Sequence, residues 1–421
     1  MKNGVLFYLI VASVYLEAIL AVLSSESIPV TLFQIIFIVS FFIFVGYKLL
    51  NDDFEVYYND YAFLLVIFIA IIFVSLIYSA DRLNGFVNAI RFIVLVVFAG
   101  FLTNLIVEKS QIKKGLIFAS VLCMILAAIS MGESLFNPDI VIQNFLSQGT
   151  KLTRSAAGGI FNDPNRFAAS LFIPLAFGFS LMNSSINIKY RIAGGIIFLM
   201  ILGGVVTSYS RSGFLAVVFI SMINLYYFKK IKPFAYLALA AIIVVFFIPS
   251  LRLIFFTYSG RIIDLITGAG PDASSSIRVM LGIAGIKMFL NSYGLGVGFD
   301  AFNEHFTSYF TIQKSIGVVE PHNITYTVLA ELGVHGFFIF AVIVFFLFRD
   351  AINNIKKSEE VMDRIIAVTL FSSFCGYVIF YQLYGGGLMD NILMFNIALI
   401  LVHKRFLLSN NKAFHKPNFN F

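Results

Sequence analysis

Long runs of apolar residues recur along nearly the whole chain, and no other feature of the sequence constrains the fold as strongly. A run of 18 or more such residues with few charges is long enough to cross a bilayer as a helix. Charged residues make up only 12% of the 421 residues, about half of the roughly 25% that is typical of soluble domains. The sequence therefore predicts an all-α, polytopic integral membrane protein.

About twelve spans can be placed, and we expect residues 1–421 to form a single polytopic membrane domain. The first span begins close to Met1 and lacks a clear small-residue cleavage site, so a retained signal-anchor is expected. The expected spans lie approximately at 4–22, 30–50, 61–79, 86–106, 113–131, 166–183, 190–208, 212–228, 233–251, 323–347, 364–385 and 389–402.

Lysine and arginine are concentrated in one set of short loops and at the two termini. The positive-inside rule therefore places both termini in the cytoplasm and the segments 132–165 and 252–322 on the outer side. Segment 252–322 is much longer than an ordinary connection. Within it, RIIDLI and SIRVMLGIAGIKMFL have apolar residues at helical spacing, which predicts amphipathic helices on the membrane surface.

Two arginines stand at the outer ends of helices. Arg211 opens the eighth span in TSYSRSGFLAVV, and Arg278 lies in SSSIRVMLGIAGIKM. A structural interpretation is available for each: a side chain that anchors Arg211 at the headgroups, and a solvated helix face for Arg278. The functional interpretation is anion binding, because a guanidinium matches phosphate oxygens geometrically and the serines before Arg278 predict a helix N-terminus.

The stretch PHNITYTVLAELGVHG, residues 321–336, begins the tenth span with polar groups. His322 is suited to accept a proton near neutral pH, although it could simply be a hydrogen-bonded residue at a helix start. Glu331 and His335 are four residues apart, and a structural pair is the favoured use for them.

The entry to the sixth span, GGIFNDPNRFAASLF, carries Asp163, Asn165 and Arg166. This Asn-Asp-Pro-Asn run predicts first of all a turn and a helix cap, with contact to substrate as the alternative. Asp390, which follows three glycines before the last span, has the same status.

Other chemistries have no support in the sequence. It contains no Cys/His set at metal-ligand spacing, no phosphate-binding loop and no nucleophile elbow, so neither a metal nor a cofactor is predicted. Cys123 and Cys375 lie inside predicted spans and are expected to be buried thiols. The basic residues belong mainly to cytoplasmic loops, so nucleic acid is not an expected partner.

In four stretches the sequence resembles the bacterial O-antigen polymerase and O-antigen ligase family. They are GGIFNDPNRFAASL, SYSRSGFLAVV, SSSIRVMLGIAGIKMFLNSYGLGVGFDAF and PHNITYTVLAELGVHG, within residues 156–340. The last fits a family pattern of His-Asn, nine residues, Gly, two residues and Gly, which His322, Asn323, Gly333 and Gly336 meet.

This resemblance implies a GT-C-like glycosyltransferase of the bacterial inner membrane whose active site faces the periplasm. Its donor would be a glycan on undecaprenyl diphosphate, transferred without a metal to an acceptor sugar hydroxyl. Arg211 and Arg278 would bind the diphosphate, and His322 would orient or deprotonate the acceptor. Asn323, Asn165 and Arg166 are the expected substrate-binding residues, and Gly333 and Gly336 are expected to allow close helix packing.

The resemblance leaves the acceptor open. GGIFNDPNRFA resembles polysaccharide polymerases more than core ligases, so a polymerase that extends a lipid-linked repeat, together with a chain-length regulator, is the first expectation. A ligase acting on lipid A-core is the alternative. A flippase or other transporter is a further alternative, for which Arg91 inside the fourth span would matter most.

Overall fold

The computed structural model describes residues 3–20, 31–51, 56–57, 61–136, 163–208, 210–230, 273–306, 308–309 and 322–409. All regular secondary structure within these ranges is helical. The helices are α1 (Asn3–Leu20), α2 (Leu32–Leu50), α3 (Ala62–Leu76), α4 (Arg82–Leu105), α5 (Lys109–Phe136), α7 (Pro164–Ser170), α8 (Phe172–Asn183), α9 (Ile188–Thr207), α10 (Arg211–Tyr227), α13 (Ala273–Asn291), α14 (Phe302–Phe306), α15 (Ile324–Lys357), α16 (Val361–Tyr384), the 3-10 helix η3 (Gly387–Met389) and α17 (Asn391–Ser409).

The protein is a polytopic membrane protein. Within the described ranges, eight helices are long and apolar enough to cross a bilayer, and three shorter apolar helices accompany them. These helices fall where eleven of the twelve spans are predicted. The predicted ninth span, 233–251, and the RIIDLI segment lie outside the described residues.

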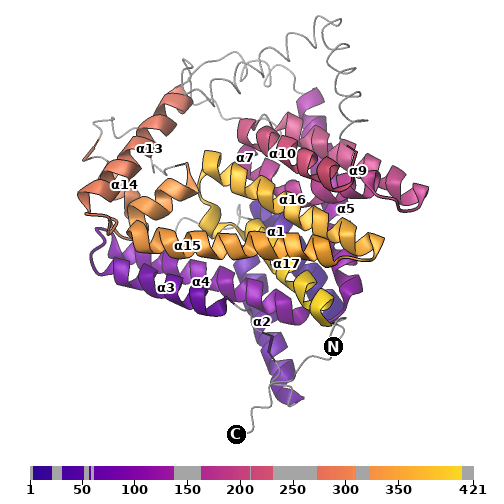
Figure 1. The fold of residues 1–421 in the computed structure, drawn as a ribbon, viewed down its shortest axis with the longest axis horizontal. Helices are drawn as coiled ribbons and strands as arrows, with labels where there is room; N and C mark the ends of the chain where they lie inside the picture. The colour runs from indigo at the N-terminus through magenta and orange to yellow at the C-terminus, as the bar shows by residue number, and fades with distance from the viewer. Residues whose placement is uncertain are drawn as a thin grey trace, which may run out of the picture.

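Helix α16 lies at the centre of the bundle, where it packs against α8, α10, α15 and α17 (Figure 1). Small side chains make this position possible: a Cβ on Gly376 would lie 2.6 Å from the Ile220 side chain. Buried polar groups are satisfied between the helices. Asn224 donates to Ser372 Oγ over 2.8 Å, and Ser180 donates to Asn224 Oδ1 over 2.5 Å. These bonds fix α8, α10 and α16 relative to one another.

Helix α15 is broken at Gly333, which has φ +67° and ψ −165°. A side chain at Gly333 would overlap the backbone of the loop at Gly294 and Leu295. That loop uses the backbone groups released by the break, because Val297 N donates to Ala330 O over 2.9 Å and Val334 N donates to Gly294 O over 2.9 Å. The glycine therefore permits close packing as predicted, but its partner is a loop and not a helix.

Glu331 has a different structural role from the one its spacing to His335 predicts. Its carboxylate is buried and accepts hydrogen bonds from Asp300 N over 3.0 Å and Phe302 N over 3.4 Å. Gly333 lies between Glu331 and His335, and its non-helical backbone removes the i,i+4 geometry that the spacing assumes.

Helix α13 lies across one end of α15, and its inner face buries Leu281, Ala284 and Met288 (Figure 1). Its outer face is mixed: Val279, Ile283, Ile286 and Leu290 are exposed and apolar, and the exposed Lys287 lies among them. Most of this face is suited to contact with lipid, and Lys287 gives it one charged group.

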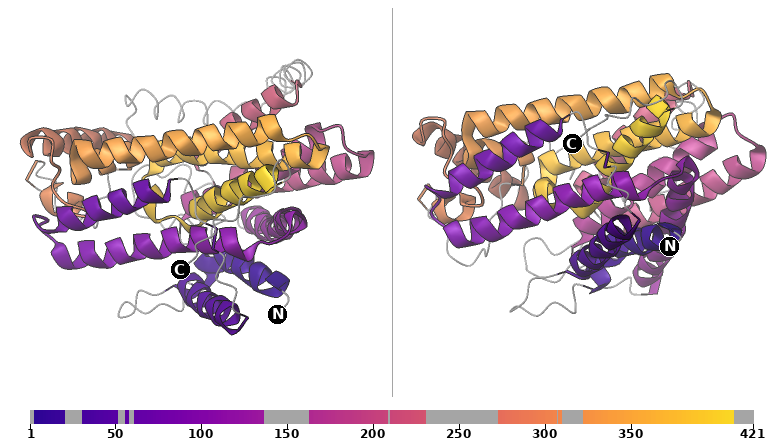
Figure 2. Two further views of the ribbon diagram at one scale, coloured as in Figure 1. Left: turned by 60° about the horizontal axis from the view of Figure 1, so that its bottom comes forward. Right: turned by 90° about the horizontal axis from the view of Figure 1, so that it is seen from below.

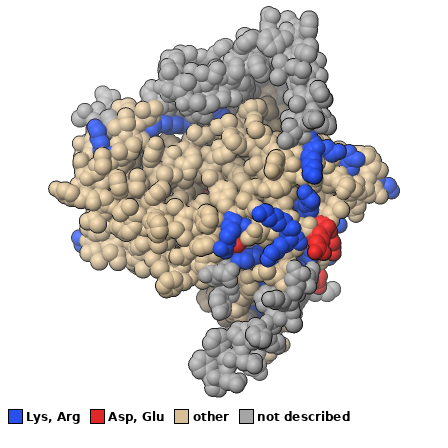
Figure 3. Space-filling view, in the orientation of Figure 1, with Lys and Arg blue, Asp and Glu red and all other residues tan. Residues whose placement is uncertain are grey.

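Helices α3 and α4 lie beside α15 on the face away from α10 (Figure 2). On the face seen in Figure 3, most of the described surface is uncharged, and lysine and arginine side chains gather in limited areas with a few acidic side chains beside them. This distribution is what a bundle embedded in hydrocarbon requires.

Candidate functional site

The Asn-Asp-Pro-Asn run forms the cap of α7, as the sequence predicts. Asp163 is the N-cap residue, its carboxylate accepts from Asn165 N over 2.7 Å, and Pro164 occupies the first helical position. The Asn165 amide also donates to Asp163 Oδ1 over 3.2 Å. These bonds orient the Asn165 side chain toward the start of α10.

At the start of α10, Ser210 is the N-cap residue and accepts from Gly213 N over 3.0 Å. The Ser210 hydroxyl donates to Asn165 Oδ1 over 2.7 Å, which joins the N-termini of α7 and α10. A Cβ on Gly213 would lie 2.7 Å from Ala168 Cβ, so the two helices approach closely. Arg211, the first residue of α10, is half-buried beside this junction.

His322 precedes α15 with a left-handed backbone, φ +44°. Its Nδ1 lies 2.7 Å from the carbonyl oxygen of Tyr384, at the end of α16. Because a carbonyl only accepts hydrogen bonds, Nδ1 carries the proton and the lone pair of the neutral ring is on Nε2. Gly385, at φ +83°, permits this approach, since a Cβ there would lie 2.9 Å from His322 Cα. Such a strained backbone at a polar junction is typical of functional sites.

Asn323 fastens the start of α15 to α16. It is the N-cap residue of α15, accepting from Tyr326 N over 3.0 Å, and its amide donates to Gln382 O over 2.9 Å. Thr325 donates to Gln382 Oε1 over 2.9 Å. The predicted helix-start role of this stretch is therefore confirmed, and its bonds also fix the position of the His322 ring.

One further hydrogen bond joins the two halves of the site: the Tyr384 hydroxyl donates to Asp163 Oδ2. A continuous chain of polar contacts thus runs from His322 through Tyr384, Asp163 and Asn165 to Ser210. This chain connects residues from three of the stretches that the sequence analysis identified. It also includes Tyr384, which sequence reasoning missed. The three glycines directly after Tyr384 were the available signal.

Arg166 and Asp390 lie at the same junction. The exposed Arg166 interacts electrostatically with Tyr384, Asp390, Tyr381 and Asp163. Asp390 Oδ1 accepts from Leu393 N over 2.7 Å, as expected for a cap at the start of α17. Arg166 therefore places a guanidinium at the ends of α16 and α17, near His322 and its partner Tyr384.

Arg278 reaches this region from another helix. Gly282 and Gly285 of α13 face Tyr326, and a Cβ on Gly282 would lie 3.1 Å from that ring. Arg278 is one helical turn before Gly282 and is half-buried on the same side of α13. It therefore lies on the face of α13 that packs against the first turn of α15, directly after His322 and Asn323.

The six predicted site residues thus come from the starts of three helices, α7, α10 and α15, and from α13. His322, Asn165 and Arg166 are linked through Tyr384 and Asp163, and Asn323 joins the same end of α16 through the Gln382 carbonyl. Among the described residues, no group of three or more His, Cys, Asp or Glu side chains could hold a metal ion.

The family model described as O-antigen ligase matches residues 196–341, a range that includes Arg211, Arg278, His322 and Asn323. Residues 196–341 belong to the O-antigen ligase domain family. Members of this family transfer lipid-linked glycans. No curated protein matches the chain. Asn165, Arg166 and Tyr384 lie outside the O-antigen ligase match, and the structure brings them to the domain's residues.

Proposed function

We propose that this protein is a glycosyltransferase that moves a glycan from undecaprenyl diphosphate to a sugar hydroxyl at the periplasmic face of the bacterial inner membrane. The chain of polar contacts from His322 to Ser210 supports this best, because it gathers separate sequence stretches around one histidine and the guanidinium groups. In this proposal both termini are cytoplasmic, and residues 252–322 form a periplasmic loop.

The proposed reaction is a displacement at the anomeric carbon of the donor sugar. The acceptor oxygen forms the new bond to that carbon while the bond from carbon to the diphosphate oxygen breaks. The electron pair leaves with the diphosphate, and the proton of the acceptor hydroxyl passes to His322 Nε2. The Tyr384 carbonyl holds the tautomer in which Nε2 can accept that proton.

Arg211, Arg278 and Arg166 bind the diphosphate in this proposal. Negative charge grows on the leaving group as the glycosidic bond breaks, and positioned cations stabilise that charge more than they stabilise the bound donor. Guanidinium groups suit this task because they present paired donors to phosphate oxygens. Asn323 and Asn165 fix the positions of the histidine and the helix ends. Their side-chain amides also form hydrogen bonds to sugar hydroxyls in this proposal.

The first proposed reaction is polymerisation, in which the acceptor is another lipid-linked repeat and a chain-length regulator is a partner. The stretch around Asn165 and Arg166 supports it by resemblance. Ligation to lipid A-core is the alternative, and the description of the matching family favours it. Both reactions use the same donor and the same proposed residues.

Purified protein supplied with undecaprenyl-diphosphate glycan, and with neither metal nor nucleotide, tests the proposal. The lipid-linked repeat and lipid A-core are offered separately as acceptors. Product ladders on the repeat that disappear in Arg278→Ala and His322→Ala support a polymerase, and transfer only to lipid A-core supports a ligase. His335→Ala is the matched control, since His335 lies beyond the Gly333 break.

Transfer to neither acceptor by correctly inserted protein would overturn the proposal. Transport of the lipid-linked glycan would then be tested at Arg91. That residue donates to Asn88 Oδ1 over 2.9 Å, and Asn88 donates to Asp300 Oδ2 over 2.5 Å, so Asn88 links Arg91 to the loop before α14.

A further inference from the structure

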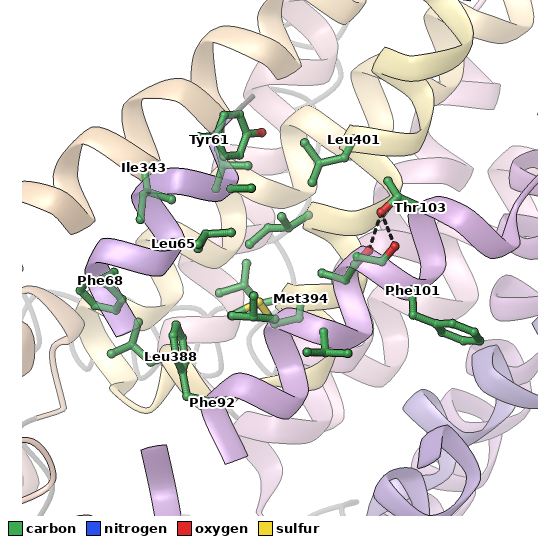
Figure 4. Close-up of a pocket in the computed structure, with 18 of the residues that line it drawn as sticks. Tyr61, Leu65, Phe68, Phe92, Phe101, Thr103, Ile343, Leu388, Met394 and Leu401 are labelled. Atoms are coloured by element: carbon green, nitrogen blue, oxygen red, sulfur yellow. Dashed lines mark hydrogen bonds between the residues drawn. The ribbon is translucent and has the colours of Figure 1, made fainter. Parts of the chain in front are cut away.

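A large apolar cavity lies between α2, α3, α4, α15, α16 and α17, with a volume of about 640 Å³. This is within the range of roughly 300–1,000 Å³ that is typical of ligand pockets. Phe68, Phe92 and Met394 are among the side chains that line it (Figure 4). Lys48 is the only charged residue among those described that line the cavity. Such a largely apolar lining suits a hydrocarbon chain.

One end of the cavity meets the candidate site. Ile324, which directly follows Asn323, and Gln382, whose carbonyl accepts from Asn323, both line it. Leu388 of η3 lines the same end, close to the glycines that follow Tyr384. The opposite end is lined by Lys48 and Asn104. The cavity thus leads away from the His322 junction toward the other end of the bundle.

The cavity is elongated along the helices. On α4 its lining residues run from Phe92 to Asn104, and α15 contributes Ile324 at one end and four residues between Phe340 and Leu347. At 1.5 Å per residue, the α4 stretch alone spans roughly 18 Å. This is more than half of the roughly 30 Å thickness of the hydrocarbon core of a bilayer.

The cavity also reaches the lipid-facing surface. Three of its lining residues are exposed on the outside of the bundle: Leu49 at 56%, Val56 at 63% and Val97 at 39%. These exposed apolar side chains connect the cavity lining with the outer surface of the described bundle.

We propose that this cavity binds the polyprenyl chain of the lipid-diphosphate donor, an inference that rests on the proposed function. In the donor, the diphosphate links the reacting anomeric carbon directly to the polyprenyl chain. The chain therefore starts one diphosphate away from the reacting atoms. In a lipid-linked acceptor, the whole glycan separates the reacting hydroxyl from its lipid. An apolar cavity that begins beside the site fits the donor chain and not the acceptor chain.

Gly100 offers a way to block the cavity without disturbing the fold. It lines the cavity on α4, and a Cβ built on it meets no atom within 4 Å. Gly100→Phe therefore adds a ring to the cavity, away from the site end, and removes a poor helix former. Gly132→Phe is the matched control, because Gly132 is also helical with no atom within 4 Å of a built Cβ and does not line the cavity.

The experiment measures kcat/KM with one fixed acceptor and two donors that carry the same glycan, on an undecaprenyl chain or on a two-isoprene chain. We expect the wild type and Gly132→Phe to prefer the long donor by about tenfold or more, since each buried methylene adds to binding. Gly100→Phe should lose about tenfold with the long donor and stay unchanged with the short one.

A second measurement identifies the occupant directly. A polyprenyl diphosphate with a photoreactive group in its chain should label α4 and α15 peptides in the wild type and not in Gly100→Phe. Excess undecaprenyl diphosphate should prevent this labelling, and phosphatidylglycerol should not.

Several outcomes would overturn the inference. Equal use of both donors by an active wild type would contradict binding of the polyprenyl chain in the cavity and leave the proposed function intact. An equal loss with both donors in Gly100→Phe would show a structural effect, and competition by phosphatidylglycerol would show an ordinary lipid in the cavity. Absence of transfer by the wild type to either acceptor would overturn the proposed function and this inference together.

Discussion

The two ends of the α15–α16 pair are held together by different chemistry. At the end where α15 terminates and α16 begins, cations meet buried carboxylates: Lys404 Nζ lies 2.9 Å from Asp350 Oδ2, and Lys109 pairs with Asp363. At the end where α15 begins and α16 terminates, the helices are joined mainly by amide, hydroxyl and carbonyl groups around His322.

The difference indicates what each end does. In a buried ion pair the two charges compensate each other within the protein. Removing one partner leaves an uncompensated charge that destabilises the fold. At the other end, hydrogen bonds fix the geometry around His322, the charged Asp163, Asp390 and Arg166 lie close by, and the Nε2 lone pair of His322 is left for chemistry. Substitutions at the first end should therefore lower stability, and substitutions at the second should lower activity in a protein that stays folded.

The largest expected effect follows replacement of His322. His322→Ala removes the proposed proton acceptor, so kcat should fall by roughly 10²–10⁴-fold, the usual contribution of general base catalysis. The thermal midpoint in detergent should stay close to that of the wild type, because Asn323 still caps α15. Initial rates of glycan transfer provide the measurement, with His335→Ala as control. Near-normal rates in His322→Ala would contradict the proposal that the His322 end of the α15–α16 pair carries the activity.

Arg211 should rank next. Arg211→Ala removes a cation from the leaving diphosphate, and a loss on the order of a hundredfold in kcat is expected. Arg211→Lys should recover only part of it, because an ammonium lacks the paired donors of a guanidinium. Arg191→Ala is a suitable control, since Arg191 is exposed on α9. Full recovery by lysine would mean that charge alone matters at this position.

At the opposite end, Lys109→Met should lower stability and leave the rate per folded molecule unchanged. The Asp363 side chain is only 4% exposed, and this change leaves its carboxylate without Lys109. Because Lys109 itself is partly exposed, we expect a loss of about 2 kcal/mol in the free energy of unfolding, below the range for fully buried pairs.

The double variant Lys109→Met/Asp363→Asn separates this pairing from other effects of the lysine. It should regain most of the lost stability, because the buried carboxylate is then absent. Thermal unfolding in detergent measures both variants. If the double variant is no more stable than Lys109→Met, the ion pair does not account for the loss.

The same contrast explains what the sequence could predict. Helix positions followed from apolar runs because bilayer thickness sets the length of a span. Most described helices match the predicted spans closely, but α15 and α17 continue past the predicted ends at 347 and 402 to Lys357 and Ser409. The cap at Asp163 followed from local chemistry, whereas the capping role of Asn323, expected as a substrate-binding residue, was not predicted. These features depend only on residues that are close together in the chain.

Contacts between distant residues could not be predicted in this way. The bond from Tyr384 to Asp163 joins residues 221 positions apart, and the one from His322 to the Tyr384 carbonyl spans 62 positions. Both depend on how α7, α15 and α16 pack. The break in α15 could not be predicted from the sequence either. Gly333 tolerates helical and left-handed backbone alike, and the loop packed against it selects between them.

The smallest effect should come from Tyr384→Phe, which tests whether the junction acts as one unit. This change removes the hydrogen bond to Asp163 and keeps the backbone carbonyl that binds His322 Nδ1. We expect kcat to fall by about tenfold or less, since one hydrogen bond of this kind contributes about 1 kcal/mol. Tyr377→Phe is the control: its buried hydroxyl donates to Ala169 O over 3.1 Å, so its loss should affect stability alone. If both variants lower stability equally and neither changes kcat, the Tyr384 hydroxyl only holds helices together, and orientation of His322 depends on the carbonyl alone.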